Sequence, residues 1–222
     1  MKKTITTAAM TLLIGGAFAA QVFAFSDVPS DQFAAINSLT EQGVVKEVDA
    51  GHFAPKEYLN YAQAISIIVK GFNLNLDTLR FFKMPVPTNF YPSVKDNVWY
   101  SDAFITAHYN GITIPHDVDP RSTVTREQFA KMIEEAMKKA KSLPMIKIVP
   151  IEIKDNVDIT VDSQGFIQRL LHYKIIKLDQ EGRFQPKQSI TRGDSAVWIY
   201  NALEVLSKMP APPEPSAPTD QL

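Results

Sequence analysis

The stretch "TVTREQFAKMIEEAM" (Thr123–Met137) joins a helix-capping signal to a charge that the signal does not explain. Thr125 is a typical N-cap residue, and Gln128, three residues later, can return a hydrogen bond to it and complete a capping box. Arg126 follows the cap directly, although the positive end of the helix dipole disfavours a cation in the first turn. The stretch therefore predicts a helix that begins after Thr125 and a separate role for Arg126.

The same pattern occurs three times in the chain. "FAPKEYLNYAQAISIIVKGF" begins at Phe53, "VDPRSTVTREQFAKMIEEAM" at Val118 and "FQPKQSITRGDSAVWIYNAL" at Phe184. In each copy a proline precedes a capping side chain by five residues, and a residue that can complete the box stands three positions after the cap. The prolines, caps and box residues are Pro55, Asn60 and Gln63; Pro120, Thr125 and Gln128; and Pro186, Thr191 and Asp194. Such a repeat indicates one supersecondary unit used three times.

Another helix is predicted upstream of each cap. The expected ranges are Phe33–Gln42, Trp99–Asn110 and Ser163–Tyr173. Gly43 and Gly111 follow the first two, as a left-handed helix C-cap favours, and Lys174 stands at that place in the third. The unit is therefore a helix, a turn with a short extended piece, and a capped helix.

These units predict a mainly α protein. We expect repeats at 25–76, 90–142 and 151–208, joined by linkers near 73–89 and 138–150, and a disordered proline-rich tail at 209–222. The capped helices of the first and third repeats are apolar almost all round, so they need cover on several sides. The three units are therefore expected to share one core.

The N-terminus predicts export. Lys2 and Lys3 precede an apolar stretch, and small residues stand at the positions that a signal peptidase reads before a cut after Ala24, so residues 1–24 are interpreted as a signal peptide. No later stretch is apolar for long enough to cross a bilayer. Removing the two lysines takes the net charge from −1 to about −3, which argues against nucleic acid as a partner. The chain has no cysteine, so its stability must come from its core rather than from disulfides.

Several of these motifs together resemble the S-layer homology domain. They are "FSDVPSD" from Phe25, the Phe-x-Pro turns at Phe53 and Phe184, Trp99 before a helix that ends in Gly111-Ile112, and the boxes "VTREQFA" and "ITRGD". The resemblance implies a pseudo-threefold trimer of repeats with a central three-helix bundle. It also implies attachment to the cell surface through secondary cell-wall polysaccharide, which often carries a pyruvylated amino sugar, and it implies no cofactor.

The resemblance also implies which residues meet the ligand. In this family the arginine of the box is a main anion contact, in grooves between neighbouring lobes. That arginine corresponds to Arg126 and, with more departures around it, to Arg192. Tyr61 stands at the ligand-binding position of the first repeat, where the anion contact is expected to be lost. Trp99 is the candidate sugar platform. One good groove or two are expected rather than three.

Each of these residues also has a purely structural interpretation. The cap and box residues Asn60, Thr125, Thr191, Gln128 and Asp194 are expected to act as caps, worth about 1 kcal/mol each, rather than as ligand contacts. Arg126 and Arg192 could instead pair with Glu127, Asp194 or an acid on a neighbouring lobe. Trp99 could pack within its lobe, and Trp198 is expected in the core.

An enzyme is the competing class of protein. The four histidines have no metal-ligand spacing, and the sequence has neither a cysteine nucleophile nor a Gly-x-Ser-x-Gly elbow, so no catalytic residue and no metal ligand is predicted. The leading hypothesis is a non-enzymatic, exported, S-layer-associated protein of the cell wall that binds an anionic wall glycan. The alternatives are a degenerate module that binds another envelope protein during assembly, and a secreted hydrolase.

Overall fold

The computed structural model describes residues 25–141, 143 and 149–209, so the predicted signal peptide and the tail beyond Met209 lie outside the described residues. The described helices are α1 (Ser30–Glu41), α2 (Tyr61–Gly71), α3 (Ser101–Tyr109), α4 (Arg126–Ala140), α5 (Val161–His172) and α6 (Arg192–Lys208), with 3₁₀ turns η1 (Pro87–Asn89) and η2 (Asn156–Asp158). Extended pairing in this part of the chain is limited to isolated bridges. The mainly α class is confirmed.

The helices α2, α4 and α6, here called the capped helices, begin directly after the predicted caps. The Asn60, Thr125 and Thr191 side chains each accept a hydrogen bond from the backbone N–H three residues later, at 2.9, 3.2 and 3.1 Å. Gln63 and Gln128 return the second bond of the box.

The predicted box of the third repeat is wrong in one respect. The carboxylate of Asp194 does not return a bond to the backbone of Thr191 but pairs with Arg126 of the second repeat. Aspartate is one methylene shorter than glutamine, and a nearly buried guanidinium attracts a carboxylate more strongly than a backbone N–H does.

The helices α1, α3 and α5, here called the lobe helices, end at the predicted positions. Gly43, Gly111 and Lys174 all adopt the left-handed conformation, with φ of 71°, 79° and 58°. Helix α1 begins at Ser30, before the predicted Phe33, because Pro29 in an extended conformation already serves as the N-cap. Helix α4 continues to Ala140, so the second linker begins later than expected.

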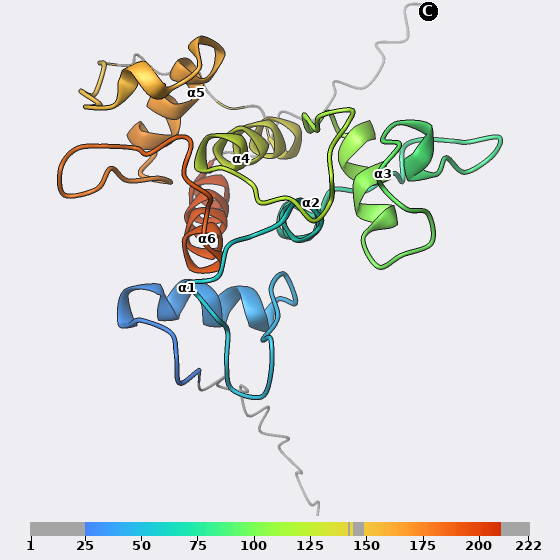
Figure 1. The fold of residues 1–222 in the computed structure, drawn as a ribbon, viewed down its shortest axis with the longest axis horizontal. Coiled ribbons are helices and arrows are strands. Elements are labelled where there is room, and N and C mark those ends of the chain that lie inside the picture. Colours follow the sequence, from blue (N-terminus) through green and yellow to red (C-terminus); the bar gives the residue numbers. More distant parts are fainter. Residues whose placement is uncertain (1–24, 142, 144–148, 210–222) are drawn as a thin grey trace, which may run out of the picture.

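A ring of backbone hydrogen bonds closes the three repeats on one another. Leu59 N donates to Ile190 O at 3.0 Å, Ile190 N to Val124 O at 2.9 Å, and Val124 N to Leu59 O at 3.0 Å. Each of these residues stands directly before a cap, so the three capped helices start from one point. Figure 1 shows α2, α4 and α6 in the middle and the lobe helices around them. Such a ring is what a threefold arrangement of repeats requires.

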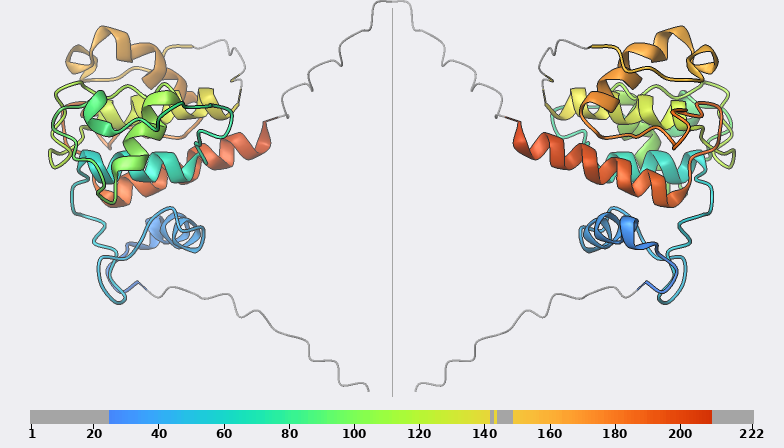
Figure 2. Two further views of the ribbon diagram at one scale, coloured as in Figure 1. Left: turned by 90° about the vertical axis from the view of Figure 1, so that its right-hand side faces the viewer. Right: turned by 90° about the vertical axis from the view of Figure 1, so that its left-hand side faces the viewer.

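Each lobe helix packs against the capped helix of a different repeat. Helix α3 contacts α2, α5 contacts α4, and α1 crosses the length of the chain to contact α6. In the side views α1 lies beyond α6, on the side away from the other two lobes (Figure 2). The buried hydrophobic side chains of all three repeats form one cluster. The expectation of a shared core is confirmed.

Candidate functional site

The site begins with the two Phe-x-Pro turns. The carboxylate of Asp27 accepts hydrogen bonds from the backbone N–H groups of Phe53 and Ala54, at 3.0 and 2.7 Å. Asp155 binds Phe184 and Gln185 in the same way, at 2.8 and 2.7 Å. These bonds hold Ala54 and Gln185 at φ of 57° and 59°, which non-glycine residues seldom adopt.

Each box arginine binds one of these turns in another repeat. Arg192 Nε donates to Phe53 O at 3.0 Å, and its guanidinium carbon lies 4.6 Å from the Phe53 ring centroid. Arg126 Nε donates to Phe184 O at 2.9 Å, with its guanidinium carbon 5.5 Å from that ring. An arginine in the first turn of the helix therefore joins two repeats, which offsets its unfavourable interaction with the helix dipole.

The sequence contains a signal of this pairing. The second repeat has Val118 in place of the turn phenylalanine, and the first repeat has Tyr61 in place of the arginine that would bind it. Arginine and phenylalanine are thus lost together from positions that meet across repeats. The sequence analysis noted the departure at Tyr61 but did not connect it with Val118.

Three grooves lie between the repeats, and all three repeats contribute to each. A groove is bordered by the first-turn residue of one capped helix, the box residue of a second, and the start of the lobe helix of the third repeat. In the Arg192 groove the box residue is Gln63 and the residue at the start of the lobe helix is Trp99, and the groove has a volume of about 310 Å³. In the Arg126 groove these two residues are Asp194 and Asp31, and the volume is about 220 Å³. In the Tyr61 groove they are Gln128 and Asp162, and the volume is about 430 Å³.

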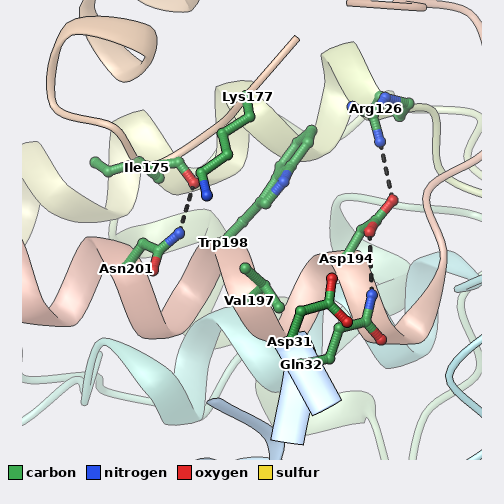
Figure 3. A pocket seen from close by; sticks show the side chains of 9 residues that line it. All are labelled: Asp31, Gln32, Arg126, Ile175, Lys177, Asp194, Val197, Trp198 and Asn201. Atoms are coloured by element: carbon green, nitrogen blue, oxygen red, sulfur yellow. Dashed lines mark hydrogen bonds and ion pairs between the residues drawn. The ribbon is translucent and has the colours of Figure 1, made fainter. Parts of the chain in front are cut away.

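The cation of the Arg126 groove is already paired (Figure 3). Arg126 Nη1 lies 3.0 Å from Asp194 Oδ2, and its side chain is only 13% exposed. The guanidinium carbon also lies 4.8 Å from the Trp198 ring, which is in the core as predicted. Burial lowers the pKa of Arg126, and the carboxylate of Asp194 opposes this shift. The structural interpretation of this arginine, pairing with Asp194, is the arrangement found.

The Arg126 groove is also narrow, because Gly193 lets α1 approach α6 closely. A Cβ atom at Gly193 would lie 2.2 Å from Gln32 Oε1, so a larger residue would displace the Gln32 side chain. Gln32 Nε2 reaches Asp194 Oδ1 at 3.5 Å, and Asp31 stands at the exposed rim (Figure 3). Lys177 also lines this groove, but the carboxylates of Asp31 and Asp194 on two sides of it disfavour an anionic ligand.

The Arg192 groove differs in that its arginine has no carboxylate partner in the described part of the chain, although Glu47 also lines this groove. Arg192 Nη2 donates to Lys46 O at 2.9 Å, and none of the described carboxylates is within ion-pair distance of the guanidinium. Burial lowers the pKa of Arg192, opposed by the charges of Glu57 and Asp27 farther away. The exposed side chain of Lys70 on α2 adds a second cation to the wall.

Trp99 lies on the wall of the Arg192 groove, not in the core and not in the Arg126 groove. Its side chain is 68% exposed, and its ring packs edge-on against Tyr100 at 5.2 Å. The structure therefore brings together an arginine of the third repeat, a lysine of the first and a tryptophan of the second. An exposed aromatic face beside cations can contact the apolar face of a sugar and its acidic substituent at once.

The Tyr61 groove carries no arginine at this position. Tyr61 is buried, and burial raises the pKa of its hydroxyl. Nearby, the buried carboxylate of Glu127 accepts hydrogen bonds from Thr160 N at 2.9 Å and from Lys187 Nζ at 2.7 Å. Burial favours the neutral acid, but these hydrogen bonds prevail and lower the pKa of Glu127 to about 2. This carboxylate joins the second repeat to the third.

Comparisons with known proteins match the first and third of the three predicted repeats. The model of the S-layer homology domain matches residues 24–65 and 159–196. The chain is 26% identical over 206 residues to the S-layer protein sap of Bacillus anthracis, and 27% identical over 209 residues to an S-layer protein of Bacillus licheniformis, in each case over 87% of this chain. It is also 26% identical over 183 residues, 82% of its length, to an endoglucanase of Bacillus sp. (strain KSM-635).

The chain spans about a fifth of the length of these relatives, from 19% of the endoglucanase to 23% of the S-layer protein sap. None of the described helices is long and apolar enough to cross a membrane. The matched segments contain both Phe-x-Pro turns and the boxes of the first and third repeats. The chain therefore carries two segments of the S-layer homology domain, and it is a protein of the cell surface.

Proposed function

We propose that this protein attaches non-covalently to an anionic secondary cell-wall polysaccharide through the Arg192 groove. The observation that carries the proposal is the meeting of Arg192, which has no carboxylate partner among the described residues, with the exposed ring of Trp99. The Arg126 groove is a weaker candidate, because Asp194 already pairs with its cation. One groove of the three therefore has the chemistry that the sequence analysis assigned first to Arg126.

The groove suits a sugar that carries a carboxylate, such as a pyruvate ketal. Arg192 uses Nε and Nη2 for backbone carbonyls, and no described residue bonds to its Nη1. A guanidinium fixed in this way loses little conformational entropy when it binds an acid. Trp99 offers a flat apolar face, and Lys70 adds charge attraction at the rim.

We propose a binding role rather than an enzymatic one. In the described residues no three histidine, cysteine or acidic side chains gather as metal ligands. The match to the endoglucanase covers 19% of that protein, and S-layer proteins match the same chain over a similar length. A secreted hydrolase would release sugar from purified walls, so an assay for soluble products at high protein concentration tests this class.

The decisive experiment is co-sedimentation of the mature protein, residues 25–222, with native walls and with walls stripped of their acidic polymer. We expect binding to native walls only. Arg192→Ala should weaken it by about tenfold or more, close to 1.4 kcal/mol. Arg121→Ala is the matched control, because Arg121 is an exposed arginine paired with Asp119 and outside the grooves. Equal binding to stripped walls, or full binding by a folded Arg192→Ala protein, would contradict the proposal.

A second function becomes the better explanation if the protein does not bind cell walls. Two of the three grooves have lost their free arginine, one to Tyr61 and one to the pair with Asp194. A degenerate module of this kind would serve another envelope protein during assembly. Pull-down of envelope proteins with the wild type, and not with the Arg192→Ala protein, would favour this alternative only in the absence of wall binding.

A further inference from the structure

The loop that connects α2 to η1 projects from the outer edge of the molecule, beside α3 (Figure 1). Phe81 packs edge-on against Tyr109 of α3, with ring centroids 5.0 Å apart, which fixes the base of the loop. The next residue, Phe82, is fully exposed, Met84 is 61% exposed, and Leu79 is exposed as well. Three of the nine exposed large hydrophobic side chains in the described residues thus fall within six positions of one loop.

The same loop carries positive charge. Arg80 and Lys83 alternate with the exposed apolar residues, and Asp77 is the nearest acid in the sequence. Lys139 of α4 borders the hollow beside Leu79. The whole chain has a net charge of −1, so this tip is cationic against a slightly acidic background.

We propose that residues 79–84, here called the apolar tip, insert into the surface of an anionic lipid bilayer. Phe82, Met84 and Leu79 would enter the region between headgroups and acyl chains, and Arg80 and Lys83 would bind lipid phosphates at the same depth. The proposal does not depend on the glycan site, because the tip lies outside the three grooves.

The shape of the tip favours a bilayer over a protein partner. A protein interface buries large and complementary surfaces on both sides, whereas this loop is a narrow projection of the chain (Figure 1), and its exposed apolar residues lie within six positions. A lipid surface deforms around such a projection and supplies negative charge to both cations. Aromatic and aliphatic side chains with adjacent lysine or arginine are the composition that membrane interfaces select.

The test is sedimentation of the mature protein with vesicles of phosphatidylglycerol and phosphatidylcholine in equal amounts, and with pure phosphatidylcholine. We expect the wild type to bind the anionic vesicles, more weakly at high salt. The double variant Phe82→Ser/Met84→Ser should lower the partition coefficient by about tenfold or more. Arg80→Gln/Lys83→Gln should reduce binding and remove its salt dependence.

The control is Val157→Ser/Val161→Ser, which replaces two exposed valines on the lobe of the third repeat. This variant should bind anionic vesicles as the wild type does. The proposal is overturned if the wild type binds no vesicles at millimolar lipid, or if the Phe82→Ser/Met84→Ser protein binds them equally well. It is also overturned if those two substitutions instead dissolve a dimer seen by sedimentation velocity, because the tip would then contact a second copy.

Discussion

The Arg192 and Arg126 grooves are built from the same kinds of residue, and they differ in what pairs with the guanidinium group of the arginine. Both arginines follow a threonine cap, donate through Nε to the carbonyl of a Phe-x-Pro turn, and lie against the phenylalanine ring. Across the Arg192 groove stands Gln63, whose side chain folds back onto its own helix cap. Across the Arg126 groove stands Asp194, whose carboxylate makes no bond to its own helix cap and instead lies 3.0 Å from the guanidinium of Arg126.

A residue of another repeat therefore decides the role of each box arginine. A neutral box residue that completes its own cap leaves the arginine available to a ligand. A short acidic one is drawn to the buried cation and takes the place that a ligand carboxylate would occupy. The motif around each arginine is therefore not enough to identify a binding site.

Arg126→Ala gives the largest expected effect. Arg126 is nearly buried, and its loss removes two charge-assisted hydrogen bonds and leaves Phe184 O without its partner. The free energy of unfolding should fall by about 3 kcal/mol. Wall binding by the folded protein should stay within about twofold of the wild type. Denaturant unfolding and wall co-sedimentation measure the two quantities. A folded Arg126→Ala protein that no longer binds walls would move the site back to this groove.

The Tyr61 groove extends the comparison through the pH dependence of stability. The pKa of Glu127 is lowered from 4.5 to about 2 in the folded protein, so its ionised form stabilises the fold. This contribution is complete above pH 4.5 and is lost as the pH falls towards 2, because the folded protein must then take up the proton that the unfolded chain already holds. The expected loss is on the order of 2 kcal/mol.

Glu127→Gln should remove this part of the acid dependence and lower stability at neutral pH, since Lys187 then lacks a charged partner. Denaturant unfolding between pH 5 and about pH 2 measures it. Glu41→Gln, at an exposed acid outside the grooves, should leave the profile nearly unchanged. An identical slope in the wild type and in Glu127→Gln would show that other acids dominate.

Local chemistry made the elements of this fold predictable. The three helix starts follow from Asn60, Thr125 and Thr191, and the helix ends follow from Gly43 and Gly111. Lys174 adopts the left-handed conformation without being glycine, at the place that the alignment of the repeats gave it. Interactions within a few residues decide all of these features.

The contents of the grooves could not be predicted in the same way. Trp99 and Arg192 meet because three repeats from distant parts of the chain border one groove, and periodicity alone does not say which repeats are neighbours. The pair of Arg126 and Asp194 likewise joins residues of different repeats. The joint absence of arginine at Tyr61 and of phenylalanine at Val118 was the available signal of neighbourhood.

Trp99→Ala tests whether the open groove uses its aromatic wall. The side chain is mostly exposed, so stability should change by less than about 0.5 kcal/mol. Wall binding should weaken by about fivefold, near 1 kcal/mol, through loss of the sugar platform. Trp99→Phe should retain most of the affinity. Undiminished binding by Trp99→Ala would leave the cations as the whole site and would contradict the role given to the ring.

Asp194→Asn gives the smallest expected change in wall binding among the substitutions aimed at the difference between the two arginine grooves, and it tests directly whether the Asp194 carboxylate causes that difference. The substitution keeps the backbone N–H that Thr191 caps, but removes the carboxylate that pairs with Arg126. We expect stability to fall by about 1 kcal/mol and wall binding to rise by about twofold, as a second arginine becomes available.

The double variant Arg192→Ala/Asp194→Asn separates the two causes that close the Arg126 groove. If Asp194 blocks an otherwise competent groove, this protein should recover part of the wall binding that Arg192→Ala loses. If it recovers none, the close approach of Gln32 to Gly193 excludes the ligand whatever the charge. In that case the single open groove is set by the packing of α1 on α6, and neutralising the carboxylate cannot restore a second site.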